Sequence, residues 1–172
     1  MSLTLYDAAF PPVLRMLGSL STILDKAAAH CAARNIDPSV LLSYRIAPDM
    51  FPLVRQIQTV TDQAKGMAAR LAGIDVPSFP DTEATIEELK ARLAKTRDFV
   101  SSITPAQVAG AEEREIVLKL RMELRFNGRD YVFGFVLPNF YFHASTAYGI
   151  LRHAGVDLGK LDFMGARDQI KA

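Results

Sequence analysis

Apolar residues recur at spacings of three and four in four separate segments, and this periodicity constrains the fold more than any other feature of the chain. Such spacing gathers side chains on one face of an α-helix, so each segment is predicted to be an amphipathic helix. Four helices of this kind bury their apolar faces against one another. The sequence therefore predicts an all-α four-helix bundle, a single domain over residues 1–172.

The first helix is predicted to reach about Arg34, with Pro11 and Pro12 in its first turn and residues 3–10 in a separate turn. Its apolar face consists of Val13, Leu17, Leu20, Leu24, Ala27 and Cys31. The second helix is predicted to begin near Pro48 or Asp49 and to end before Gly73, a C-terminal cap. Its apolar face consists of Met50, Leu53, Ile57, Val60, Ala64, Met67 and Leu71.

The third helix is expected to follow a cap at Asp81 or Thr82 and to end at Thr104-Pro105. Its apolar face consists of Ile86, Leu89, Leu93, Thr96 and Val100. The fourth is expected to run from about Pro138 to Gly155, and residues 156–172 are interpreted as a strap over the bundle surface. Its inward face consists of Phe140, His143, Ala144, Ala147, Ile150, Leu151 and Ala154.

The segment between the second and third helices, "GIDVPSFPDT", determines how they are connected. Its two prolines favour an extended chain, and ten residues can span about 33 Å. A helix of about 24 residues is roughly 36 Å long, which is nearly the same length. The segment is therefore predicted to cross the whole bundle, which leaves the second and third helices parallel.

The stretch "EIVLKLRMELRF" alternates between apolar and charged residues, which is the period of a β-strand. Its apolar side consists of Ile116, Leu118, Leu120, Met122, Leu124 and Phe126. Asn127-Gly128 is a typical two-residue hairpin turn, and "RDYVF" is predicted to be the returning strand. Two strands alone are marginal in water, so this hairpin, inserted before the last helix, is expected to pack on the bundle or on a second subunit as a homodimer.

Composition excludes several classes of function. Lys plus Arg number 20 and Asp plus Glu number 19, so the formal net charge of +1 gives no basic surface for nucleic acid or for an anionic membrane. Apolar runs are too short to span a bilayer, and the first residues lack the basic start of a signal peptide. Cys31 is the single cysteine, so an intrachain disulfide is excluded. These features predict a cytoplasmic protein.

His143 is the main candidate for chemistry, because it lies on the inward face of the last helix. An inward imidazole is either a hydrogen-bonded pocket residue, a metal ligand or a catalytic group. A second ligand on the same helix would stand three or four residues on, at Thr146 or Ala147. His153 is too far along the helix to share a metal with His143.

Polar residues at seven-residue spacing flank the apolar face of the second helix: Asp49, Gln56 and Gln63. They either line a polar cleft with His143 or form a solvated row at the edge of the helix. His30, near the end of the first helix, is interpreted as a favourable charge at a helix C-terminus. The "DQAK" stretch from Asp62 to Lys65 is expected to be exposed.

Four stretches together resemble an uncharacterised bacterial family of unknown function within the DinB/YfiT-like putative metalloenzyme superfamily: "LYDAAFPPVLRMLGSLSTILDKAAAH", "DMFPLVRQIQ", "PNFYFHASTAYGILRHAGVDLGK" and "LDFMG". The resemblance implies a bundle in up-down-down-up order. It also implies thiol-dependent transferases or isomerases that use a divalent metal such as zinc or nickel and that are often dimeric. Their ligands are a histidine on the second helix and an HxxxH pair on the fourth.

His143 matches the first position of that pair, whereas Ala147 stands at the second and Gln56 is the nearest equivalent of the second-helix histidine. Three functions follow as hypotheses. The first is a small-molecule-binding bundle with a polar pocket around His143. The second is a metal-dependent thiol transferase or isomerase with His143 as one ligand, and the third is a non-catalytic dimeric interaction protein.

Overall fold

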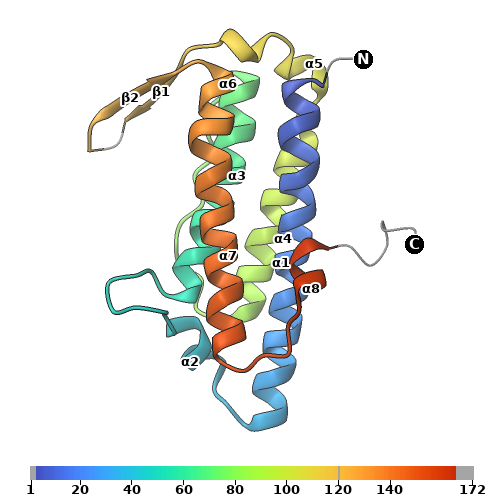
Figure 1. The fold of residues 1–172 in the computed structure, drawn as a ribbon, viewed down its shortest axis with the longest axis vertical. Helices are drawn as coiled ribbons and strands as arrows, with labels where there is room; N and C mark the ends of the chain where they lie inside the picture. Colours follow the sequence, from blue (N-terminus) through green and yellow to red (C-terminus); the bar gives the residue numbers. More distant parts are fainter. Residues whose placement is uncertain (1–2, 120, 166–172) are drawn as a thin grey trace.

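A computed structural model of the chain describes residues 3–119 and 121–165. Four long helices form the bundle (Figure 1): α1 (Leu5–Arg34), α3 (Leu53–Ala72), α4 (Ile86–Ser102) and α7 (Leu137–His153). The shorter elements are α2 (Pro38–Ser43), α5 (Pro105–Val108), η1 (Ala111–Glu113), β1 (Ile116–Lys119), β2 (Glu123–Phe126), α6 (Gly128–Asp130), η2 (Tyr131–Val136) and α8 (Lys160–Met164). The predicted all-α bundle with a β-hairpin before its last helix is confirmed.

The order of the helices also follows the prediction. The segment after Gly73 runs back along the bundle, so α3 and α4 are parallel while α1 and α7 run the opposite way (Figure 1). The most extensive contacts join α3 to α7 and α1 to α4. Gly73 ends α3 in the left-handed conformation with φ of 70°, as a glycine C-cap does.

The helix starts differ from those predicted. α1 begins at Leu5, where Thr4 and Asp7 form a capping box, and Pro11 and Pro12 lie inside the helix instead of in its first turn. Phe10 and Val13, on either side of the two prolines, are buried, and this burial offsets the hydrogen bonds that the prolines cannot donate.

The starts of α3 and α4 lie later than the sequence suggested. α3 begins at Leu53, because the residue before Pro52 is restricted to extended conformations, and residues 44–52 form a loop. α4 begins at Ile86, since Thr85 and Glu88 form its capping box in place of Asp81 or Thr82.

The hairpin turn was predicted in the wrong place. β1 and β2 pair antiparallel with Ile116 opposite Phe126 and Leu118 opposite Leu124, so the chain reverses within the alternating stretch itself. Asn127 instead caps α6, its side-chain oxygen accepting a hydrogen bond from the Asp130 amide at 2.7 Å. The expected returning strand "RDYVF" is helical and leads through the π-helical η2 into α7.

The apolar side of the hairpin packs mainly on its own chain. Ile116 and Leu118 are buried, and the Phe126 ring lies 5.5 Å from that of Phe135 in η2. Met122 is 67% exposed, and Leu120 lies outside the described residues. Packing on the bundle therefore accounts for the base of the hairpin, whereas its tip projects from the bundle (Figure 1).

The chain after α7 crosses the bundle surface, as expected, with α8 packed on α1. The rest of the expected strap, residues 166–172, lies outside the described residues. In the part of the chain that the structure describes, none of the helices combines the length and apolar character that a membrane span requires.

Candidate functional site

His143 meets Gln56 where α7 packs on α3, a contact between residues 87 positions apart in the sequence. The Nδ1 atom of His143 lies 2.6 Å from Oε1 of Gln56. Gln56 is only 1% exposed, and its Nε2 donates a hydrogen bond to the backbone oxygen of Phe51 at 3.0 Å. Both ends of the buried carboxamide are therefore paired, which holds it in one orientation.

This chain of contacts determines the tautomer of His143. The Phe51 carbonyl can only accept, so the amide nitrogen of Gln56 faces it and the amide oxygen faces His143. That oxygen is also an acceptor, and Nδ1 of His143 must therefore carry the proton. In the neutral ring, Nε2 then has the free lone pair.

The electrostatic surroundings keep the ring neutral. Partial burial lowers the pKa of His143 below its ordinary value, and the positive charge of Arg55 lowers the pKa further. Near neutral pH the site therefore presents an uncharged imidazole whose Nε2 can accept a hydrogen bond or a proton.

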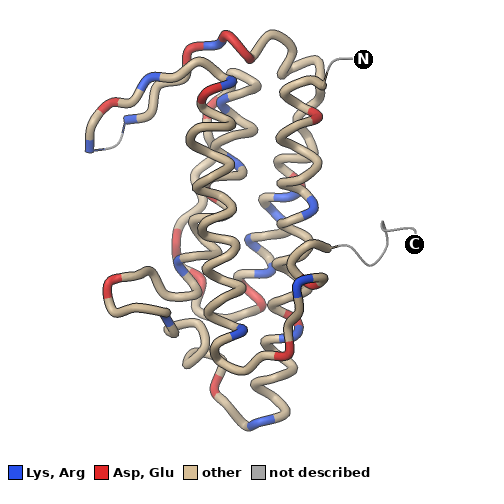
Figure 2. Tube along the Cα trace, in the orientation of Figure 1, with Lys and Arg blue, Asp and Glu red and all other residues tan. Residues whose placement is uncertain are grey.

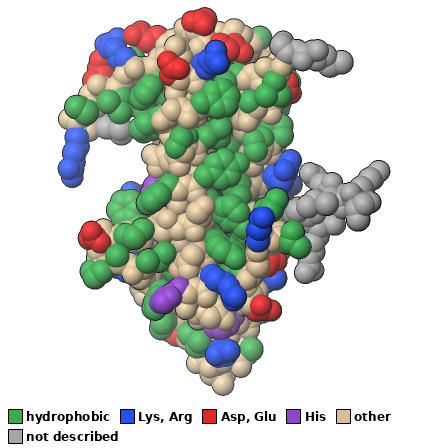
Figure 3. Space-filling view, viewed as in Figure 1, with side chains coloured by type: hydrophobic (Ala, Val, Ile, Leu, Met, Phe, Trp, Pro, Cys, Tyr) green, Lys and Arg blue, Asp and Glu red, His purple; other side chains and the backbone are tan. Residues whose placement is uncertain are grey.

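Two phenylalanine rings flank the imidazole. The Phe51 ring is nearly parallel to the imidazole, with 6.2 Å between the ring centres, and the Phe142 ring meets it edge-on, with 5.2 Å between the ring centres. These rings are 48% and 56% exposed, so apolar surface borders a polar acceptor. Apolar side chains gather on the hairpin and on the loop 44–52, and the molecular surface is recessed between them (Figure 3).

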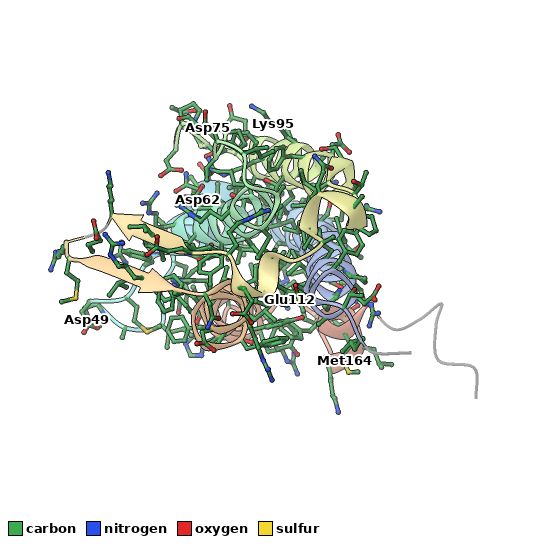
Figure 4. All side chains as sticks on the ribbon, turned by 90° about the horizontal axis from the view of Figure 1, so that it is seen from above. Asp49, Asp62, Asp75, Lys95, Glu112 and Met164 are labelled. Carbon is green, nitrogen blue, oxygen red and sulfur yellow. The ribbon has the colours of Figure 1, made fainter. Side chains whose placement is uncertain are left out.

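The structure brings together two of the four residues predicted for the pocket. Gln63 is half-buried on α3, about two turns beyond Gln56, so these two glutamines keep the expected seven-residue row. Asp49 does not belong to that row, because it lies in the loop before α3, is exposed, and is found at the periphery of the molecule (Figure 4). The expectation that Asp49 continues the helical row is therefore wrong.

The side chains around His143 do not fit a metal of the kind that the resemblance implies. Ala147, four residues on, has no donor atom, and the amide oxygen of Gln56 is occupied by Nδ1–H of His143. Within residues 3–119 and 121–165, no group of three or more His, Cys, Asp or Glu side chains is arranged to hold a metal ion. Zinc needs at least three protein ligands in a catalytic site, and one imidazole does not supply them.

A second polar cluster, which the sequence analysis missed, joins α3, α4 and the crossover segment. Arg92 is 4% exposed and forms ion pairs with Asp62 and Asp81, both at 2.9 Å, and with Glu83 at 3.0 Å. Its Nε donates to the Thr61 hydroxyl at 2.6 Å. The expectation that Asp62 to Lys65 is an exposed stretch is wrong, because Ala64 and Lys65 are buried and the two residues before them are partly buried.

This cluster holds the crossover segment against the bundle. Burial raises the pKa of Glu83, but hydrogen bonds from Gln58 and Arg92 outweigh it and hold the pKa below its usual value. The signal in the sequence was Arg92 on an otherwise apolar face, one turn from Leu89 and next to Leu93, where a cation requires carboxylate partners.

Comparison with known proteins supports the family and the fold. Residues 5–164 match the family described as "Domain of unknown function (DUF1993)". The chain belongs to the DUF1993 family. This DUF1993 chain also superposes, with a TM-score of 0.89 and 38% sequence identity, on the crystal structure of a DinB family member protein from Shewanella denitrificans; the match covers 98% of this chain and 96% of that one. No curated protein matches the chain.

Proposed function

We propose that this DUF1993 protein binds a small molecule at His143, with Nε2 of the neutral imidazole accepting a hydrogen bond from the ligand. The contact that supports the proposal is the one from Phe51 through Gln56 to Nδ1, which orients the ring and leaves Nε2 as an acceptor. Binding sites commonly combine apolar walls with a few oriented polar groups. Here Phe51 and Phe142 would supply the apolar contacts.

The same arrangement suits a ligand with a hydroxyl or amide hydrogen attached to an apolar body. Such a hydrogen can pair with Nε2 while the body covers the exposed ring faces. A cationic ligand is disfavoured, because the Arg55 guanidinium lies 5.7 Å from the centre of the Phe51 ring and is close enough to lower the pKa of His143. A cytoplasmic location is part of the proposal and rests on the single cysteine.

Nuclear magnetic resonance of the imidazole nitrogens tests the proposal. We expect the Nδ1–H tautomer in the free protein, and a change of the Nε2 resonance of His143 when phenol is added as a probe. Toluene, which has the ring but no hydroxyl, should leave that resonance nearly unchanged. His153→Gln is the matched control: it removes another histidine of α7 and should leave the resonances of His143 and their response to phenol as in the wild-type protein. An Nε2–H tautomer in the wild-type protein would refute the proposal.

A divalent-metal thiol transferase or isomerase is the alternative. One observation favours it: a metal-bound histidine usually has its second ring nitrogen held by a hydrogen bond, as Gln56 holds Nδ1 of His143. The metal content of untagged protein separates the two functions. Zinc or nickel near one equivalent per chain, lost in His143→Ala, would show that His143 holds a metal and would support the alternative, whereas small amounts that are equal in both proteins would reject it.

We also propose that the protein is a homodimer, joined through the tip of the hairpin. The base of the hairpin is covered by its own chain, but Met122 at the tip is 67% exposed. A two-fold dimer is the commonest way for a soluble protein to cover such a surface.

A further inference from the structure

A groove of about 450 Å³ lies on a different part of the bundle from His143, between α1, α4 and α8. Its lining residues are Leu14, Arg15, Gly18, Ser19, Thr22, Arg97, Leu161, Asp162 and Gly165. Helices α3 and α7, which hold Gln56 and His143, contribute none of these lining residues. The groove is thus separate from the proposed binding site and has its own chemistry.

The charges in the groove are unbalanced. Arg15 on α1 and Arg97 on α4 form no ion pair with a carboxylate within residues 3–119 and 121–165. The acidic lining residue, Asp162, lies 2.8 Å from the Lys26 ammonium and accepts a hydrogen bond from the Gly159 amide at 2.8 Å. In the described part of the protein, no carboxylate therefore compensates the positive charge of these two guanidinium groups. Basic residues stand on both α1 and α4 at mid-height of the bundle (Figure 2).

Gly18 makes the space that these arginines border. The Nη1 atom of Arg97 is 4.0 Å from the position that a Cβ on Gly18 would take, so Arg97 reaches across from α4 over the surface of α1. Arg15 stands one turn before Gly18 and therefore on the same face of α1. Its side chain packs beside Gly165, where Cγ of Arg15 is 3.4 Å from the position of a Cβ.

The other polar groups show that the groove offers a ligand mainly hydrogen-bond donors. The hydroxyls of Ser19 and Thr22 donate to the backbone oxygens of Arg15 and Gly18, at 3.2 and 3.4 Å. The N–H groups of the two arginines are therefore the donors that face a ligand. Guanidinium groups bind the oxygens of phosphates and carboxylates with paired hydrogen bonds.

We propose that this groove binds the phosphate group of a small phosphate monoester. A phosphate monoester has a charge of about −1.5 to −2 at neutral pH, which matches two arginines better than a single carboxylate does. Leu14 and Leu161 line the same groove and would contact the apolar part of such a ligand.

Calorimetry with phenyl phosphate, inorganic phosphate and benzoate on the whole chain tests this proposal. We expect phenyl phosphate to bind at least tenfold more tightly than benzoate, and we expect its affinity to fall as salt is added. Arg15→Gln and Arg97→Gln should each lower the affinity for phenyl phosphate by about tenfold, since each removes charge-assisted hydrogen bonds. Arg34→Gln, at an exposed arginine near the end of α1, should bind like the wild-type protein.

Gly18→Leu provides the second test, because leucine favours the helix, keeps both arginines and fills the space between them. We expect it to weaken phenyl phosphate binding while the unfolding midpoint is kept. The proposal is overturned if Gly18→Leu and the double variant of Arg15 and Arg97 bind phenyl phosphate as the wild-type protein does. The proposal is equally overturned if benzoate binds as tightly as phenyl phosphate, or if neither phenyl phosphate nor inorganic phosphate binds.

Discussion

At the scale of single residues, the buried carboxamide of Gln56 determines which nitrogen of His143 has the proton. The ring is half-buried and close to Arg55, and both effects lower the pKa of His143. The unfolded chain therefore binds more protons than the native protein between the native pKa and the ordinary value of about 6.5.

Stability should accordingly depend on pH through His143. Because the native pKa is lowered, the free energy of unfolding is expected to fall as pH drops below about 6.5 through the native pKa. His143→Gln should remove this part of the dependence, whereas His153→Gln should keep it. Urea denaturation at several pH values measures both effects, and equal pH slopes in His143→Gln and the wild-type protein would contradict the prediction.

Gly128 is a second residue whose role depends on its neighbours. A Cβ at this position would overlap the carbonyl oxygen of Ala111, whereas a Cβ on Gly134 would meet nothing within 4 Å. Gly128→Ala is therefore expected to lower the free energy of unfolding by about 1–3 kcal/mol, the usual cost of overpacking. Gly134→Ala is the control and should change it by less than about 1 kcal/mol. Chemical denaturation of both variants tests the difference, and similar values would show that the contact at Gly128 relaxes freely.

At the scale of the elements, the crossover segment between α3 and α4 is held by a cluster of charged residues. Arg92 on α4 joins Asp62 on α3 to Asp81 and Glu83 in the crossover. Its guanidinium also donates to the backbone oxygen of Pro80 at 3.0 Å. The cation compensates three carboxylates at once and is itself almost fully buried.

Removing that cation should be costly. Arg92→Met is expected to destabilise the protein by about 1.5–3 kcal/mol, because the half-buried Glu83 carboxylate loses its ion pair and the buried Thr61 hydroxyl loses the hydrogen bond from Nε. Asp62 and Asp81 keep Lys65 and Arg55 as partners, which limits the loss. Lys95 is an exposed cation on the same helix, and its ammonium lies 4.1 Å from the centre of the Phe79 ring. Lys95→Met should lower the free energy of unfolding by about 1 kcal/mol or less. Thermal and urea unfolding measure both variants, and an equally small loss in Arg92→Met would show that the cluster contributes little.

At the scale of the whole molecule, the hairpin is the element that projects furthest from the bundle, as the view along the bundle shows (Figure 4). If its tip joins two copies, light scattering should give twice the chain mass of 18.9 kDa. Met122→Lys should then shift the protein toward the monomer, because it places a charge on an apolar contact. Val40→Lys, at an exposed apolar residue of α2, is the control. A monomeric wild-type protein would reject the homodimer.

Periodicity in the sequence determined the four long helices, most of their buried faces and the two-sided character of the hairpin. The ten-residue segment from Gly73 to Thr82 determined that α3 and α4 are parallel, because its possible length matches that of a helix. These features depend on residues close together in the chain, and their patterns reflect burial on one side of a local element.

Tertiary structure decided where the hairpin turns, how Asn127 is used and which groups meet at each polar site. Apolar and charged residues alternate with the same period on both strands, so the alternation does not show where the chain reverses. Asn127 caps α6 at the point where Gly128 closely approaches the backbone of Ala111. Gln56 and His143 lie 87 residues apart, and Arg92 lies 30 residues from Asp62. Such pairs form only when helices pack at a particular distance and rotation, and these depend on the side chains of the whole core rather than on any local pattern.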